Sequence, residues 1–192
     1  MSHINNTEFM DESTLIDDCI KGSSLAQKKL FDKFAPKMLF VCLRYCKDKE
    51  SAEDVLQDSF IKIFTHLSEY NKDKVLEAWI RRIVVNTALD FLRKNKKESF
   101  QVSIDDAFNV FSREENPIEK MNANHLLEII HAMPKGYRIV FNLFAIEGYS
   151  HKEIAELLSI SEETSKSQFF RARTFLRKKF DLQSEYIKLE NV

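Results

Sequence analysis

The sequence predicts an all-α protein with two small helical domains joined by an acidic linker, the second domain containing a helix-turn-helix. The 192 residues include only three Gly and three Pro, which leaves few turn formers and favours long helices with short connections. A hydrophobic fraction of 44% is enough for real cores. Apolar residues also recur at helical spacing along most of the chain.

The first domain is predicted over residues 1–97. Its apolar residues form three blocks at helical spacing, which run from Leu25 to Cys42, from Val55 to Leu67 and from Trp79 to Leu92. Each block has a polar side, as expected for a helix that buries one face. The pattern therefore predicts three to four amphipathic helices packed into one bundle.

Helical spacing lapses after this domain, and residues 98–117 are predicted to form the linker. The stretch 98–120 has six acids against Arg113 and Lys120, and it contains Pro117. This composition favours an extended or irregular segment. An alternative is a loop packed inside a single domain, because apolar residues between Phe100 and Phe111 could dock on the rest of it. In a linker, the same residues suggest a partner surface.

The second domain is predicted over residues 118–192. Helical spacing returns in four segments: Ile118 to Met133, Gly136 to Ile146, Ser150 to Leu158 and Ser161 to Phe180. Pro134 and Gly148 mark the ends of the first two segments, and Ser150 with Glu153 has the spacing of a capping box.

The distribution of charge indicates nucleic-acid binding, although 29 basic residues against 30 acidic ones give a net charge of only −1. Residues 81–97 contain six bases against Asp90 alone, and residues 166–179 contain six bases and no acid. Two basic islands in an otherwise acidic chain are more specific than a high overall charge.

The stretch "SHKEIAELLSISEETSKSQFFRAR" predicts the helix-turn-helix. Ile154, Ala155 and Leu158 face inward from the first helix, and Ser161 caps the second. Residues 162–171 then form the exposed end that reaches base edges, and the later bases contact the backbone. The alternative is a charged, solvated helix. The pattern is imperfect, since Ser159 takes a turn position suited to Gly and the inward Ser165 is polar.

The first basic island lies on a helix that is otherwise apolar. Arg82, Asn86, Arg93 and Lys97 recur along one side of this helix, poised to meet phosphates or splayed bases. The preceding loop, "EYNKDKV", could form a pocket for an extruded base. Trp79 beside the stripe is either a core anchor or a wedge against a base pair.

The second block of the first domain carries an acidic, polar face. Asp54, Gln57 and Asp58 lie opposite the apolar Leu56, Phe60 and Ile63 when the block is plotted as a helix. Such a face does not bind DNA, so it is either solvated or meets a basic protein.

Several other function classes find no support. Cys19, Cys42 and Cys46 lack the spacing of a disulfide framework or a zinc site, and the last two are predicted to be core residues. We expect no cofactor, no small-molecule substrate and no catalytic site, since neither a Gly-rich phosphate loop nor a nucleophile set is present. No secretion signal or membrane-spanning run is recognised, which predicts a soluble cytoplasmic protein without membrane insertion.

With both islands placed, the chain resembles bacterial RNA polymerase sigma factors of the extracytoplasmic-function type. "AEDVLQDSFIKIF" resembles the polymerase-clamp helix of that family, and "AWIRRIVVNTALDFLRK" its promoter-melting and −10 reading helix. The stretch from "MPKGYRIVFN" to "SQFFRAR" resembles the −35 reading domain. The resemblance implies a non-enzymatic subunit that binds core RNA polymerase and directs it to promoters of a regulated, stress- or envelope-related set of genes.

The resemblance also implies three groups of site residues. Polymerase contacts would be Asp54, Gln57, Asp58, Phe60 and Ile61; −10 contacts would be Asn71, Lys72, Arg82, Asn86, Arg93 and Lys97, with Asp90 along or beside the strand; −35 contacts would be Thr164, Lys166, Ser167, Gln168, Phe170, Arg171, Arg173 and Arg177. Departures from the family pattern at Glu163, Ser165 and Gln168 affect the −35 base contacts.

The resemblance further implies an anti-sigma protein as an inhibitory partner, and an acidic linker that enters a polymerase channel built for nucleic acid. The alternative function is a stand-alone helix-turn-helix transcriptional regulator. Such a regulator would not require the acidic face around Asp58 or the basic stripe of the first domain.

Overall fold

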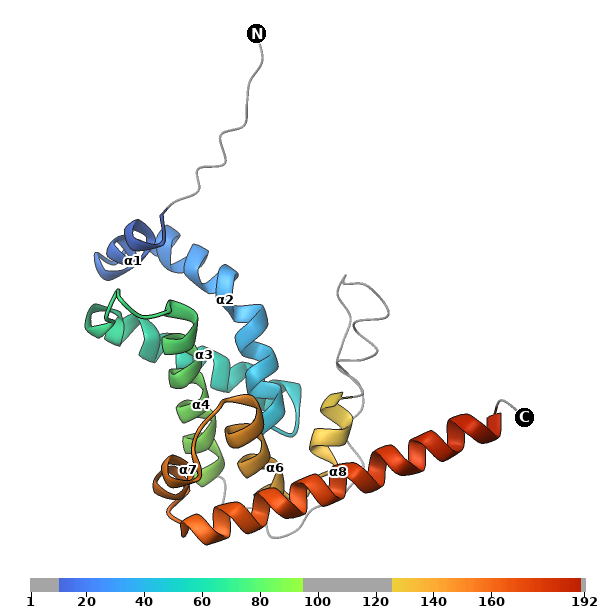
Figure 1. Ribbon diagram of the computed structural model, residues 1–192. Coiled ribbons are helices and arrows are strands. Elements are labelled where there is room, and N and C mark those ends of the chain that lie inside the picture. The colour runs from blue at the N-terminus through green and yellow to red at the C-terminus, as the bar shows by residue number, and fades with distance from the viewer. Residues whose placement is uncertain (1–10, 95–125, 191–192) are drawn as a thin grey trace. The chain divides into compact units, whose positions relative to one another are not determined.

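The computed structural model describes residues 11–94 and 126–190, with side chains as far as residue 179. The described residues are helical and contain no strand, which confirms the all-α prediction. The chain divides into two compact units, residues 1–107 and 108–192. Figure 1 labels the helices of both units. The predicted domain limits and the linker at 98–117 lie in or beside residues 95–125, outside the described part, and stay predictions.

The first unit is a bundle of α1 (Glu12–Ile20), α2 (Ser24–Tyr45), α3 (Lys49–His66) and α4 (Leu76–Lys94), with the short 3-10 helix η1 (Leu67–Glu69) after α3. Helices α2, α3 and α4 pack against one another. Two side chains cap helix starts: Ser23 accepts from Ala26 N at 3.3 Å, and Asp48 accepts from Ser51 N at 2.7 Å. The three predicted blocks therefore correspond to α2, α3 with η1, and α4.

The core of the first unit is built from the apolar faces that the spacing predicts. Leu30, Ile63, Ile80 and Val84 are each 0% exposed. Burying one such side chain fully contributes about 1.5–3 kcal/mol relative to leaving it in water. Cys42 and Cys46 are buried in the same core, as predicted, and neither forms a disulfide. Desolvation by burial raises the pKa of Cys42 to about 12.

The second unit contains a helical segment at residues 126–131, α6 (Lys135–Phe141), the π-helical turn η3 (Asn142–Ile146), α7 (His151–Leu158) and α8 (Glu162–Glu190). Ile130, Met133 and Ala172 form its buried centre, with Tyr137 and Phe141 packed against them. The prediction of one helix from Gly136 to Ile146 is therefore refined to α6 followed by η3. The last helix also continues ten residues beyond the predicted Phe180.

Candidate nucleic-acid and polymerase interfaces

Helix α3 presents the acidic, polar face that the sequence predicts. Asp54, Gln57, Asp58 and Ile61 are all exposed, and they recur every three to four residues along one side of the helix. Ile61, a large apolar side chain on this side of the helix, is 64% exposed. We call these residues the α3 surface. An apolar side chain beside carboxylates suits a protein partner better than it suits DNA.

The structure corrects the prediction for Phe60. This side chain is only 3% exposed, and its ring centroid lies 4.6 Å from that of Phe31 and 5.9 Å from that of Phe64. Phe60 therefore belongs to the core. Its role is to hold α3 against α2 from beneath the α3 surface, not to contact a partner.

Helix α4 presents the predicted basic stripe over its described length. Arg82 and Arg93 are exposed and Asn86 is half-buried between them, while Val84, Val85, Ala88 and Leu89 are buried in the bundle. We call Arg82, Asn86, Asp90 and Arg93 the α4 surface. Lys97, the last residue of the predicted stripe, lies outside the described residues.

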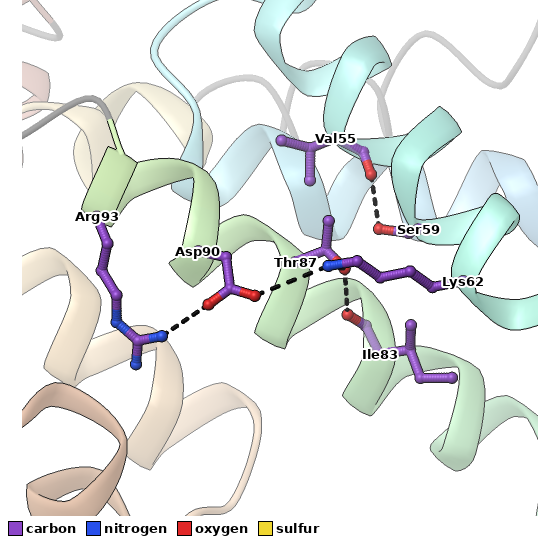
Figure 2. Close-up of polar contacts among 7 residues, drawn as sticks. All are labelled: Val55, Ser59, Lys62, Ile83, Thr87, Asp90 and Arg93. Carbon is purple, nitrogen blue, oxygen red and sulfur yellow. Dashed lines mark hydrogen bonds and ion pairs between the residues drawn. The ribbon is translucent and has the colours of Figure 1, made fainter. Parts of the chain in front are cut away.

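Lys62 of α3 lies beside the α4 surface and was missed by the sequence reasoning. Its Nζ donates to Thr87 Oγ1 at 3.2 Å and lies 3.7 Å from Asp90 Oδ2 (Figure 2). Arg93 Nη1 pairs with Asp90 Oδ1 at 2.7 Å. The sequence does not reveal that α3 and α4 pack side by side. This packing brings a basic side chain of the acidic helix α3 to the edge of the basic helix α4.

The loop before α4 makes contacts within itself and with α1. Asn71 Oδ1 accepts from Asp73 N at 2.9 Å, and the Tyr70 hydroxyl donates to the Lys74 carbonyl. Lys72 Nζ donates to Asp17 Oδ1 at 2.7 Å and to Ser13 Oγ at 3.1 Å, so this predicted −10 residue is held by α1. Both side chains of the Lys72–Asp17 pair are about half exposed, so this contact contributes at most about 1 kcal/mol.

Trp79 follows this loop at the start of α4. Its ring centroid lies 5.4 Å from that of Tyr70, and the side chain is half-buried. This position favours the role of an anchor at the base of the loop over that of a wedge.

The helix-turn-helix forms as its local signals dictate. Ser150 and Glu153 make the predicted capping box, in which Glu153 N donates to Ser150 Oγ at 3.3 Å and Ser150 N donates to Glu153 Oε2 at 2.8 Å. Ser159, at the turn position suited to Gly, ends α7 with φ of 53°, a left-handed conformation that carries a modest cost for a residue with a side chain. Ser161 Oγ then accepts from Thr164 N at 3.0 Å and caps α8.

The part of α8 from Glu162 to Arg177, which we call the recognition helix, exposes most of the predicted −35 residues. Lys166, Ser167, Phe170, Arg171, Arg173 and Arg177 are exposed, and Thr164 is half-buried. Phe170 is 69% exposed. Glu162 pairs with Lys166 at 2.8 Å, and the hydrogen bond from Lys166 lowers the pKa of Glu162. Both partners therefore stay charged through the neutral pH range.

The structure removes Gln168 from the exposed set. A Cβ atom added to Gly136 would lie 2.8 Å from Gln168 Oε1, so the carboxamide packs against the start of α6. The Oε1 atom is buried. Gln168 thus connects the recognition helix to α6, and a side chain at position 136 would displace the end of Gln168.

The inward polar residue Ser165 has a partner that the sequence reasoning did not assign. Ser165 is 0% exposed, and its Oγ lies 2.9 Å from His151 Nδ1. The His151 ring stacks on Phe144 at 4.2 Å between centroids, with an interplanar angle of 14°. A buried hydroxyl with a hydrogen-bond partner costs little, so Ser165 can replace an apolar side chain here. The sequence feature that could have indicated this contact is His151, the first residue of α7.

Two sections of the chain match known families. Residues 30–98 match Sigma-70 region 2, which includes the α3 and α4 surfaces, and residues 124–176 match Sigma-70, region 4, which includes the helix-turn-helix. These surfaces and the two-unit helical fold therefore belong to the sigma-70 class of transcription proteins.

Individual relatives agree with this class. The chain is 31% identical over 137 residues to the ECF RNA polymerase sigma factor SigM of Bacillus subtilis, a match that covers 70% of this chain and 83% of that protein. It is 27% identical over 183 residues to the RNA polymerase sigma-H factor of Pseudomonas aeruginosa, covering 90% and 94%. The sigma factor RpoE of Bartonella quintana, solved in complex with the anti-sigma factor NepR, has a similar fold: TM-score 0.53, 19% identity, 80% of this chain and 96% of that one.

The chain belongs to the ECF family of RNA polymerase sigma factors. Its function class is accordingly the direction of transcription initiation to promoters, as the resemblance implies. The alternative of a stand-alone regulator does not account for the region 2 match, which spans most of the first unit.

Proposed function

We propose a division of labour among three surfaces of this sigma factor. The α3 surface binds core RNA polymerase, the α4 surface with the loop at 70–75 binds the opened −10 strand, and the recognition helix binds −35 duplex DNA. The observation that carries the proposal is the occurrence of an exposed basic helix in each unit, together with the acidic, partly apolar α3 surface in the first.

Electrostatics support the assignment of the α3 surface to a protein partner. Asp54 and Asp58 would repel a phosphate backbone, and the exposed Ile61 gives the partner an apolar contact. A basic protein surface of the polymerase fits both features.

The recognition helix supports the −35 assignment through the order of its side chains. Thr164, Lys166 and Ser167 lie near its N-terminal end, where a helix in the major groove reaches base edges. Arg173 and Arg177 follow, where contacts to phosphates fix the register.

The proposal also covers the cellular location of the protein and its binding partners. Polymerase and promoter DNA lie in the bacterial cytoplasm, so the protein would act there, and the proposal assigns it no catalytic step. The relative from Bartonella quintana was solved with an anti-sigma factor, and we include an inhibitor of this class among the proposed partners, acting on a regulated stress- or envelope-related gene set. Among the described residues, no helix is long and apolar enough to cross a bilayer.

A polymerase-binding measurement tests the α3 surface. Asp58→Arg reverses one exposed charge, and we expect it to weaken binding to core polymerase at least tenfold, the effect of about 1.4 kcal/mol at a charged interface. Asp32→Arg makes the same change on the exposed side of α2, outside the proposed surface, and should bind like the unaltered protein. Equal affinities of the two variants would contradict the proposed surface.

A further inference from the structure

One acidic side chain lies between two basic side chains at the junction of α3 and α4. Asp90 Oδ1 contacts Arg93 Nη1 at 2.7 Å, and Asp90 Oδ2 lies 3.7 Å from Lys62 Nζ (Figure 2). Each carboxylate oxygen thus faces a different cation. Arg93 and Asp90 come from α4 and Lys62 from α3, so only the folded bundle brings the three together.

The position of Lys62 is set by the bundle as well as by charge. Its Nζ donates to Thr87 Oγ1 at 3.2 Å, and Thr87 Oγ1 in turn donates to the Ile83 carbonyl at 2.9 Å. Thr87 is 4% exposed and therefore a fixed acceptor. A lysine held in this way loses less conformational freedom when it binds an anion than a freely rotating one does.

The three charged side chains are open to solvent and to a ligand. The exposed fractions are 46% for Lys62, 46% for Asp90 and 54% for Arg93. A carboxylate with one oxygen toward each cation has the same acceptor arrangement as the two non-bridging oxygens of a phosphodiester. A backbone phosphate could therefore replace Asp90 between the two cations without moving either helix.

We propose that Lys62 and Arg93 form a binding site for one backbone phosphate of the −10 strand, and that Asp90 occupies this site in the free protein and competes with the phosphate. The inference rests on the proposed −10 role of the α4 surface. It adds Lys62 as a DNA-binding residue and makes Asp90 a built-in competitor. The competition lowers the affinity of the free protein for DNA, so that binding depends on the polymerase to hold the strand in place.

The test uses the full-length protein and a fluorescein-labelled, mixed-sequence single-stranded DNA of twelve nucleotides, with anisotropy measured between 50 and 200 mM NaCl. All proteins carry Arg171→Ala and Arg173→Ala, so that the recognition helix does not mask the first unit. Lys62→Ala is compared with Lys49→Ala, and Asp90→Asn with Glu53→Gln. Lys49 and Glu53 form an exposed pair on the same helix α3, with N to O distance 3.5 Å, and so match each change in charge.

Removing the competitor should strengthen binding and removing the cation should weaken it. We expect Asp90→Asn to raise affinity about two- to fivefold, the range set by an exposed ion pair, with a smaller gain when Lys62→Ala is also present. Lys62→Ala should reduce the slope of log K against log salt by about 0.7, the loss of one phosphate contact on a single strand. Lys62→Arg should restore binding, and neither control should change it by as much as its partner variant.

Two outcomes would overturn the inference. The first is an Asp90→Asn affinity equal to or below that of the parent, and the second is a Lys62→Ala salt slope equal to that of Lys49→Ala. Thermal unfolding of each variant checks that the bundle is intact, and Lys62→Arg keeps the test valid if the alanine variant is unstable. Because the assay contains no polymerase, its result is independent of whether the protein supports transcription, so failure of the proposed function is recognised separately.

Discussion

The hydrogen bond between Ser165 and His151 predicts that Ser165→Ala, which removes only the Oγ atom, will destabilise the packing of the recognition helix. In Ser165→Ala the His151 Nδ1 loses its partner at a position where Ser165 is 0% exposed. A hydrogen bond of this kind contributes about 0.5–1.5 kcal/mol net, and the polar atom left behind in a half-buried site adds to the loss. We therefore expect destabilisation of about 1–2 kcal/mol.

For a unit of this size, a loss of 1 kcal/mol lowers the unfolding midpoint by about 4–8 °C. Differential scanning calorimetry of the full-length protein measures this shift in the transition of the second unit. Ser167→Ala is the matched control, because Ser167 lies on the same helix but is exposed. A surface substitution changes stability by at most about 0.5 kcal/mol, so its midpoint should move by less than about 4 °C.

A double-mutant cycle with His151→Ala isolates the contact itself. The coupling free energy between the two positions should be about 1 kcal/mol. A coupling near zero, or a Ser165→Ala midpoint equal to that of Ser167→Ala, would refute the view that this bond compensates for a polar residue in the helix-turn-helix core.

Three further outcomes follow from single contacts. Gly136→Ala should change the free energy of unfolding by less than about 1 kcal/mol, because the end of Gln168 can turn away, and a chemical denaturation loss above 2 kcal/mol would contradict this. Glu162→Gln releases Lys166 and should strengthen duplex DNA binding about twofold at low salt; weaker binding by anisotropy would exclude this masking role. Cys42, with a pKa raised to about 12, should resist iodoacetamide at pH 8 in the folded protein but not in urea. The pKa of Cys42 in the folded protein lies above the ordinary 9.0, so the free energy of unfolding is unaffected by this thiol below pH 9. As the pH rises from 9 toward 12, the free energy of unfolding should fall by about 1.4 kcal/mol per pH unit, and Cys42→Ala should abolish this fall.

The sequence predicted most of the fold because its signals are local. The capping box at Ser150, the cap at Ser161 and the helical spacing of Ile63, Ile80 and other apolar residues each act within a few residues. The π-helical turn after Phe141 was not predicted, since a change from one helical hydrogen-bonding register to another leaves no mark in apolar spacing.

Side-chain roles that depend on contacts between helices could not be predicted in this way. Phe60 shares its position in the repeat with the buried Leu56 and Ile63, yet the family pattern alone placed it among the partner contacts. Lys62 and Gln168 are determined by neighbours on α4 and α6, which are distant in sequence. A family motif shows which residues match those of relatives, whereas the exposure of each side chain depends on how the helices pack.

Transcription reconstituted from purified parts tests the central claim most directly. Core polymerase is incubated with genomic DNA of the source organism, with and without the protein, and the 5′ ends of the transcripts are sequenced. The account predicts a set of start sites that appears only with the protein, shares two sequence elements upstream, and is lost with Asp58→Arg but kept with Asp32→Arg. Start sites that are the same with and without the protein would contradict it.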